Sequence, residues 1–279
     1  MSEHDDLHDH DLGLSHDLPR ILGRRRLLTV LGGVGATVAV AACGSDDGTS
    51  PTGTSGGQGG PSSQTDATVA DGEIPEETAG PFPGDGSNGP DALGQSGVVR
   101  SDITGSFGGS SGTAEGVPLT IRLKIHDVSG EDVSPYAGAA VYLWHCSREG
   151  EYSMYSENVA DENFLRGVQA ADDAGALEFR SIFPAAYDGR WPHIHFEVYP
   201  TLDDATSAGN RLRTSQIALP EDVCKEVYEN ADGYDASVAN LQRTSLSTDL
   251  VFADGYSLQM AKVTGNVEEG FVATLNVPV

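Results

Sequence analysis

Basic side chains are scarce in this sequence. Lys and Arg together number 16 against 42 Asp and Glu, which leaves a formal net charge of −26 over 279 residues. A protein that binds nucleic acid needs cations to neutralise phosphates, so this deficit argues against nucleic acid as a partner. A solvated acidic surface explains the excess of carboxylates without any special partner.

Long apolar runs are also lacking. The candidate, residues 27–42, has 16 residues and is rich in Gly and Ala, whereas a membrane-spanning helix needs about 20 apolar residues. Arg24, Arg25 and Arg26 precede this run, and Cys43 ends it. Arginines before a short run of this kind are typical of a twin-arginine export signal. An uncleaved membrane anchor is the alternative.

The end of this run, Val40-Ala41-Ala42-Cys43-Gly44, resembles a bacterial lipobox, in which the cysteine is lipidated and becomes the mature N-terminus. We therefore expect residues 1–43 to be a twin-arginine lipoprotein signal. The mature protein is then exported and lies at the outer face of the cytoplasmic membrane or at the cell surface, attached to the membrane only through the lipid on Cys43. An ordinary cleavage site beside a chance cysteine is the alternative.

Apolar side chains are almost absent again from residues 44–65, which consist mainly of Gly, Ser, Thr and Asp. Such a stretch cannot build a core and behaves as a flexible tether. We expect a Gly/Ser-rich linker over residues 44–75 and one folded domain over residues 76–279.

Cysteine is rare as well, with three in the chain. If Cys43 is lipidated, Cys146 and Cys224 remain. An oxidising compartment permits a disulfide between them, but two buried thiols explain the sequence equally well, and both possibilities stay open.

The folded part is dominated by short β-rich segments separated by clusters of Gly, Pro, Asp and Asn. These segments are residues 118–128, 139–147, 176–182, 192–199, 214–219 and 271–277. One short helix is expected at residues 221–230. The pattern predicts a mainly β protein, a β-sandwich with little helix and with long loops that carry function.

Histidine gives the first sign of a site. Of the eight histidines, His193 and His195 stand one residue apart in a predicted strand. Residues i and i+2 of a strand point to the same face, so the two imidazoles lie side by side, as metal ligands would. No histidine follows His195, which disfavours three-histidine zinc sites and cupin-type sites whose further histidine lies later in the chain.

Oxygen donors can complete such a pair. A carboxylate would give a His₂-carboxylate site, since acids are abundant. Tyr152 and Tyr187 are the other candidates, because a phenol has a pKa of about 10 and trivalent iron is charged enough to deprotonate it. Two phenolates and two imidazoles form a reasonable Fe(III) shell. Each tyrosine alone is equally well explained as a core aromatic, so the hypothesis depends on the set of four.

Five segments carry a specific resemblance to a known family: EETAGPF (76–82), VVRSDI (98–103), GAAVYLWHCSREGEYS (138–153), FLRGVQAADDAGALEFRSIFPAAYDGRWPHIHF (164–196) and TSQIALPED (214–222). Together they resemble the intradiol ring-cleavage dioxygenases, the catechol and protocatechuate dioxygenases that use non-haem Fe(III). The pattern is nearest to the exported, single-domain members and covers roughly residues 76–278. Phe82 stands where the family usually has tyrosine, and Ala185 where it often has glycine.

The resemblance implies a site and a reaction. The Fe(III) ligands would be Tyr152, Tyr187, His193 and His195, and the catalytic residues Tyr187, Arg190 and Gln216. Tyr187 would leave the metal and take a proton from the substrate, Arg190 would stabilise negative charge that develops on it, and Gln216 would donate a hydrogen bond near its oxygen-bearing atoms. The enzyme would cleave a small aromatic diol with O₂ between its two hydroxylated carbons, giving a cis,cis-muconate-type product.

Two other classes of function stay open. A non-catalytic cell-surface β-sandwich lipoprotein fits the signal, the tether and the acidic surface, because a fold does not fix a function. A divalent-metal hydrolase would use the histidine pair with a carboxylate. The sequence leaves the particular catechol and the oligomeric state open.

Overall fold

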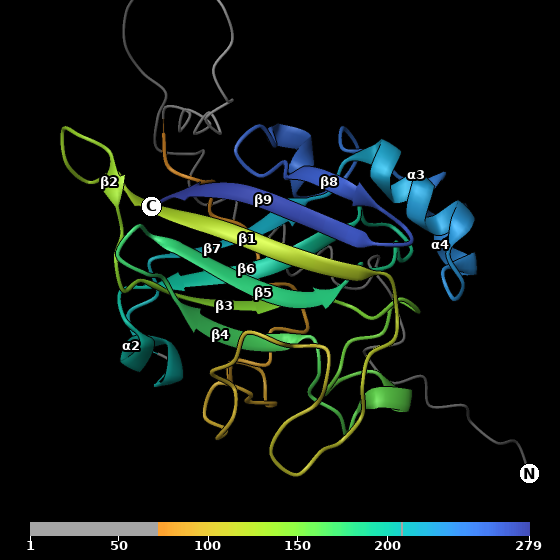
Figure 1. The fold of residues 1–279 in the computed structure, drawn as a ribbon, viewed down its shortest axis with the longest axis horizontal. Helices are drawn as coiled ribbons and strands as arrows, with labels where there is room; N and C mark the ends of the chain where they lie inside the picture. The colour runs from red at the N-terminus through yellow and green to blue at the C-terminus, as the bar shows by residue number, and fades with distance from the viewer. Residues whose placement is uncertain (1–71, 208) are drawn as a thin grey trace, which may run out of the picture. The chain divides into compact units, whose positions relative to one another are not determined.

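The computed structural model describes residues 72–207 and 209–279. The predicted export signal and nearly all of the predicted linker therefore lie outside the described residues. None of the helices in these two ranges is both long and apolar enough to cross a bilayer. The described part is a sandwich of two β-sheets with few helices, which confirms the predicted fold class (Figure 1).

The first sheet is built around a parallel pair, β1 (Pro118–Asp127) and β9 (Gly270–Pro278). β8 (Lys262–Asn266) pairs antiparallel with the other edge of β9. The remaining edge of β1 pairs antiparallel with β5 (Ala176–Ile182) and, beyond it, with the short β2 (Ser134–Pro135). β9 thus lies between β1 and β8, as Figure 1 shows.

The second sheet has four strands, all antiparallel to their neighbours. Their order is β4 (Arg166–Ala170), β3 (Ala140–Trp144), β6 (His193–Tyr199) and β7 (Arg213–Ala218). Every residue of β3 and β6 is buried. Both faces of this sheet must therefore be covered.

The two faces are covered differently. Apolar side chains from alternate strand positions fill the space between the sheets, among them Ile121, Leu123 and Ile125 of β1, Val141 and Leu143 of β3, and Ile194, Phe196 and Val198 of β6. A second cluster joins Tyr142 and Trp144 to loop residues such as Phe82 and Leu93. Because strand side chains alternate, His193 and His195 lie on the face that the loops cover, outside the core between the sheets.

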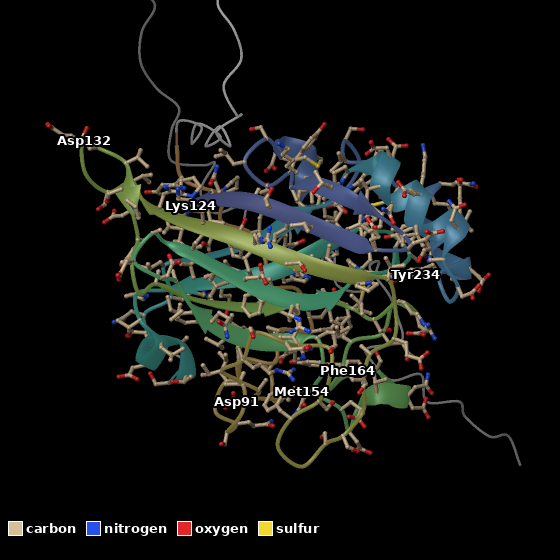
Figure 2. The ribbon with its side chains drawn as sticks, in the orientation of Figure 1. Asp91, Lys124, Asp132, Met154, Phe164 and Tyr234 are labelled. Carbon is tan, nitrogen blue, oxygen red and sulfur yellow. The ribbon has the colours of Figure 1, made fainter. Side chains whose placement is uncertain are left out.

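The helices are short. The predicted helix is present as α3 (Glu221–Asn230), whose first turn carries two acidic residues that favour the helix dipole. α4 (Asp235–Leu241) follows directly after Tyr234, which lies beside the start of β1 in Figure 2. The Tyr234 phenol donates to the carbonyl of Phe183 at 2.7 Å and so ties this turn to the loop after β5. The others are α2 (Leu202–Thr206), η2 (Glu157–Val159) and η3 (Phe252–Asp254).

Both described cysteines are buried free thiols. Cys146 belongs to the cluster under the loops, whereas Cys224 belongs to the core between the sheets. Burial raises the pKa of the Cys146 thiol to about 12, which leaves it unreactive. Of the two possibilities left open by the sequence, the structure has the buried thiols.

Candidate metal centre

The strand β6 brings both histidines to one place. His195 pairs with Trp144 of β3 on one side and with Gln216 of β7 on the other. The Trp144 ring stacks on the imidazole of His195 with centroids 4.9 Å apart and planes 5° from parallel. A Cβ atom on Gly80 would lie 3.3 Å from His195 Cε1, so this glycine lets the loop backbone approach the ring closely. Packing on both sides therefore orients His195.

A tight turn after β3 places Tyr152. Its backbone N–H donates to Ser156 Oγ at 3.0 Å, and its carbonyl accepts from the N–H of Ser156 at 2.9 Å. Met154 takes the left-handed conformation, with φ of 71°, which closes the turn. The Tyr152 side chain is 2% exposed. The turn therefore holds the phenol inside the molecule.

A buried arginine, Arg166, holds this turn against the loop that contains Phe82 and Pro83. Arg166 donates to the carbonyl oxygens of Phe82 at 3.0 Å, Pro83 at 2.8 Å and Ser153 at 2.9 Å. The Phe82 ring in turn packs on the Tyr152 ring at 4.8 Å. Arg166 thus fixes Ser153, the residue after Tyr152, and the backbone of Phe82, whose ring packs on Tyr152. The carbonyl oxygens accept the hydrogen bonds of its buried guanidinium.

Tyr187 reaches the same point from the loop before β6. A Cβ atom on Gly150 would lie 3.3 Å from Tyr187 Cβ, so the turn that carries Tyr152 runs close beside it. Tyr187 is half-buried, in contrast to the fully buried Tyr152.

Four atoms that could bind a metal lie close together: Tyr152 Oη, Tyr187 Oη, His193 Nε2 and His195 Nε2. Together they form the donor cluster. Tyr152 Oη lies 3.4 Å from Tyr187 Oη, and Tyr187 Oη lies 3.2 Å from His193 Nε2. His193 Nε2 lies 3.1 Å from His195 Nε2. Two ligand atoms each about 2.1 Å from an ion and 90–120° apart would be about 3.0–3.6 Å from each other. The spacing of these donors therefore fits a metal ion at their centre.

The electrostatics fit a highly charged cation. Burial, with the nearby charge of Arg190, holds the pKa of His193 well below its usual range, and burial with His193 does the same for the pKa of His195. Both imidazoles are therefore neutral, the form that binds a metal. Burial raises the pKa of the phenols of Tyr152 and Tyr187. A cation is needed to ionise them.

One histidine ring is also fixed by a hydrogen bond. His193 Nδ1 donates to the carbonyl oxygen of Trp191 at 2.5 Å, which leaves Nε2 unprotonated, with its lone pair free to bind a metal, facing the other three atoms. His195 Nδ1 has no such partner among the described residues.

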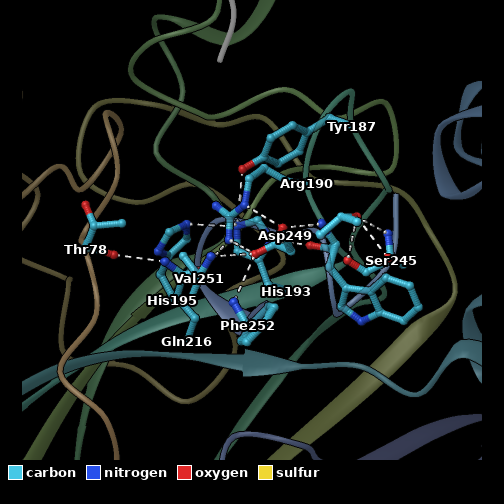
Figure 3. Close-up of polar contacts among 12 residues, drawn as sticks. Thr78, Tyr187, Arg190, His193, His195, Gln216, Ser245, Asp249, Val251 and Phe252 are labelled. Carbon is cyan, nitrogen blue, oxygen red and sulfur yellow. Dashed lines mark hydrogen bonds and ion pairs between the residues drawn. The ribbon is translucent and has the colours of Figure 1, made fainter. Parts of the chain in front are cut away.

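Arg190 and Gln216 lie beside the donor cluster (Figure 3). Arg190 Nη1 is 3.4 Å from His193 Nε2, and Arg190 Nη2 donates to Gln216 Oε1 at 2.7 Å. Gln216 Nε2 donates to the carbonyl of Thr78 at 2.9 Å. The family resemblance implied that Gln216 hydrogen-bonds a substrate. Its described hydrogen bonds go to protein groups instead, and they join Arg190 to the loop that contains Thr78.

The sequence resembles those of known dioxygenases. The family profile described as Dioxygenase matches residues 95–201. Catechol 1,2-dioxygenase of Candida albicans is 26% identical over 178 residues, 55% of this chain and 57% of the relative. Chlorocatechol 1,2-dioxygenase of Rhodococcus opacus is 36% identical over 64 residues, 23% of this chain and 24% of the relative. The matches thus span a quarter to just over half of these relatives' lengths.

A solved structure shares the fold. The intradiol ring-cleavage dioxygenase of Tetranychus urticae superposes with a TM-score of 0.54 at 22% identity, covering 66% of this chain and 87% of that one. Residues 95–201 thus resemble the dioxygenase family in sequence, and the chain shares the fold of an intradiol ring-cleavage dioxygenase. Both tyrosines, both histidines and Arg190 fall within the segment that matches the dioxygenase profile, whereas Gln216 lies beyond it. That these residues bind a metal and substrate stays a prediction.

Sequence reasoning missed one residue of this candidate site. Asp249 accepts a hydrogen bond from Arg190 Nε at 2.9 Å and is completely buried. It stands in an irregular segment between α4 and η3, with no motif or alternation around it to mark it. The preceding residues, Ser245 to Thr248, are mostly small and polar and do not distinguish this segment from a surface loop.

Proposed function

We propose that the protein is a non-haem Fe(III) dioxygenase that cleaves a small aromatic 1,2-diol between its hydroxylated carbons, with O₂ as second substrate and a cis,cis-muconate-type product. The observation that carries this proposal is the convergence of two phenol oxygens and two neutral imidazole nitrogens within 3.1–3.4 Å of their neighbours. Tyr152, Tyr187, His193 and His195 would hold the iron. The match of residues 95–201 to the dioxygenase profile and the catechol dioxygenases among the relatives support the substrate class.

Bound Fe(III) would supply the Lewis acidity that keeps both phenols ionised and makes a bound catecholate ring reactive toward O₂. The two tyrosines are built for different tasks. Tyr152 is 2% exposed and held by its turn, which suits a permanent ligand. Tyr187 is half-buried on a loop, so its phenolate can swing aside and accept a proton from the diol as a general base.

Arg190 supplies a permanent cation at the site. Its guanidinium is buried, and Nη1 faces the donor cluster. A fixed positive charge in a buried site of low dielectric stabilises negative charge on the substrate more strongly than the same charge would in water. Gln216 would act mainly by holding Arg190, as its hydrogen bonds suggest.

The divalent-metal hydrolase receives less support. Over residues 72–207 and 209–279, no group of three or more His, Cys, Asp and Glu side chains is arranged to hold a metal. The nearby buried carboxylate, Asp249, is engaged by Arg190 and by backbone N–H groups. A purely binding β-sandwich would leave the four converging donors without a role.

Colour and oxygen uptake test the proposal. Purified protein loaded with iron should be wine-red from tyrosinate-to-Fe(III) charge transfer, and it should consume O₂ with at least one member of a panel of catechols. Colourless protein that retains zinc instead of iron would favour the hydrolase, and protein that binds no metal would favour the binding module.

We also propose export and lipid attachment through Cys43. The order of arginines, apolar run, lipobox-like sequence and Gly/Ser stretch supports this route. Cys43→Ser should release the protein from the membrane fraction or block its maturation. Unchanged membrane fractionation together with no lipid on mass spectrometry would refute the proposal.

A further inference from the structure

The carboxylate of Asp249 is the best-connected buried acid near the donor cluster. Its Oδ2 accepts from Arg190 Nε at 2.9 Å and from the backbone N–H of Trp191 at 2.7 Å. Its Oδ1 accepts from the N–H groups of Val251 at 2.9 Å and Phe252 at 3.3 Å, and from Arg190 Nη2 at 3.4 Å. Figure 3 shows these contacts beside the histidines. Five donors converge on a group with no exposure to water.

We propose that Asp249 is a positioning residue that sets both the guanidinium of Arg190 and the imidazole of His193. This inference rests on the proposed function, since it concerns how the site is held for that reaction. Two contacts carry it, and both pass through the segment formed by residues 190 and 191.

The first contact is with the arginine side chain. Asp249 holds the Nε side of the guanidinium, while Gln216 Oε1 holds Nη2. Nη1 is then directed at the donor cluster, 3.4 Å from His193 Nε2. An arginine side chain has many rotamers and would be repelled by a cation at the cluster, so it needs an anchor to stay there. A buried carboxylate provides that anchor with charge and direction together.

The second contact is with the backbone. Asp249 fixes the N–H of Trp191, and the carbonyl of the same residue accepts from His193 Nδ1 at 2.5 Å. The Trp191 ring is fixed as well, since its Nε1 donates to the carbonyl of Leu219 at 2.9 Å. One carboxylate therefore orients a predicted metal ligand and the cation that would face the substrate.

Asp249→Asn is the matched substitution, because it keeps the shape but removes the charge and replaces one acceptor by a donor. Glu197→Gln is its control. Glu197 on β6 is equally buried. It pairs with Arg211 at 2.6 Å and accepts from the Tyr199 hydroxyl at 2.7 Å, so its partners lie outside the donor cluster. Both variants lose a buried carboxylate that pairs with an arginine, so a general loss of stability would appear in both.

Kinetics on the iron-loaded variants provide the first test. Asp249→Asn should retain iron, yet its kcat should fall by at least about tenfold relative to Glu197→Gln, because a misdirected cation no longer stabilises the transition state. The loss should disappear in an Arg190→Met background, where Asp249→Asn should cost less than about threefold, since the two residues act as one unit. Equal losses in Asp249→Asn and Glu197→Gln, or full additivity with Arg190→Met, would overturn the proposal.

A second readout needs neither iron nor substrate. In the wild-type apo-protein the Arg190 Nε–H should give a slowly exchanging resonance in a ¹H–¹⁵N spectrum, assigned by its loss in Arg190→Met. Asp249→Asn should make it exchange rapidly, whereas Glu197→Gln should leave it protected. Persistent protection in Asp249→Asn would overturn the proposal. If Asp249→Asn does not fold, Asp249→Glu replaces it, with weaker protection expected because the longer side chain displaces Arg190.

The two proposals can fail separately. If the wild-type protein consumes no O₂ with any catechol, the proposed function fails. The Arg190 resonance then still decides whether Asp249 orders Arg190.

Discussion

Filling the donor cluster with Fe(III) should release protons, and their number follows from the structure. Burial raises the pKa of both phenols, so Tyr152 and Tyr187 are protonated in the apo-protein near neutral pH. Burial lowers the pKa of both imidazoles, so His193 and His195 carry no extra proton to lose. Binding of Fe(III) should therefore displace about two protons, one from each phenol.

This count sets the sign and size of the pH dependence. Because the bound state has fewer protons than the apo state, affinity for Fe(III) rises with pH. Each displaced proton contributes about 1.4 kcal/mol per pH unit, so two phenols give about 2.7 kcal/mol, or roughly a hundredfold, per unit below the phenol pKa. Removal of one phenol should reduce the slope to roughly tenfold per unit.

The assay compares variants under one protocol, so that proton uptake by the iron reagent cancels. A ferric chelate is added to weakly buffered apo-protein in a pH-stat, and bound iron is counted separately. Tyr152→Phe and Tyr187→Phe should each release about one proton fewer than the wild type. Tyr155→Phe is the control, because the Tyr155 hydroxyl contacts Gly84 and Asn88 instead of the donor cluster, and it should match the wild type. Equal release by all four proteins would refute phenolate ligation.

Three further outcomes are expected. Tyr187→Phe should retain iron and part of the visible colour while kcat falls by about 10²-fold or more, since a general base is lost; unchanged stopped-flow turnover would contradict its role. A thiol reductant should leave the melting temperature in calorimetry unchanged, because Cys146 and Cys224 are free, and a clear fall would indicate a disulfide. Phe179→Ala, in the core of the first sheet, should lower the free energy of unfolding by about 3–5 kcal/mol in urea titrations while the colour persists; loss of colour at full stability would contradict the separation of core and site.

The parts of this molecule that sequence reasoning predicted are those that depend on local periodicity. β5 and α3 have the predicted bounds of residues 176–182 and 221–230, because alternation and a short amphipathic run define them locally. The predicted strand over residues 139–147 ends earlier, at Trp144. Residues 145–147, His-Cys-Ser, remain buried, but they leave the sheet and lead into the turn that carries Tyr152. A change of direction of this kind depends on tertiary contacts.

Three strands were missed, β2, β4 and β8, and the last two show a second limit. β4 begins with Arg166, and an arginine in a sequence usually indicates a surface position. Here its buried guanidinium donates to the carbonyl oxygens of Phe82 and Pro83, more than 80 residues away in the chain. β8 is mostly exposed and lacks a clear apolar face. The site shows the same difference between local pattern and distant contacts. The same-face histidine pair could be predicted from a period of two, whereas Asp249 depends on how distant loops meet.

The parallel pair of β1 and β9 has a consequence for the order in which the chain can fold during synthesis. Residues 128–269 separate the two strands, and they include all four strands of the second sheet. That sheet is complete once β7 has left the ribosome, whereas the first sheet lacks its central neighbour until β9 emerges. Because parts of a chain fold as they are made, β1 and β5 alone can cover Ile194, Phe196 and Val198 until β9 arrives, and this cover is incomplete. The nascent chain is therefore most prone to aggregation in this interval, after β6 has paired with its neighbours and before β9 completes the first sheet.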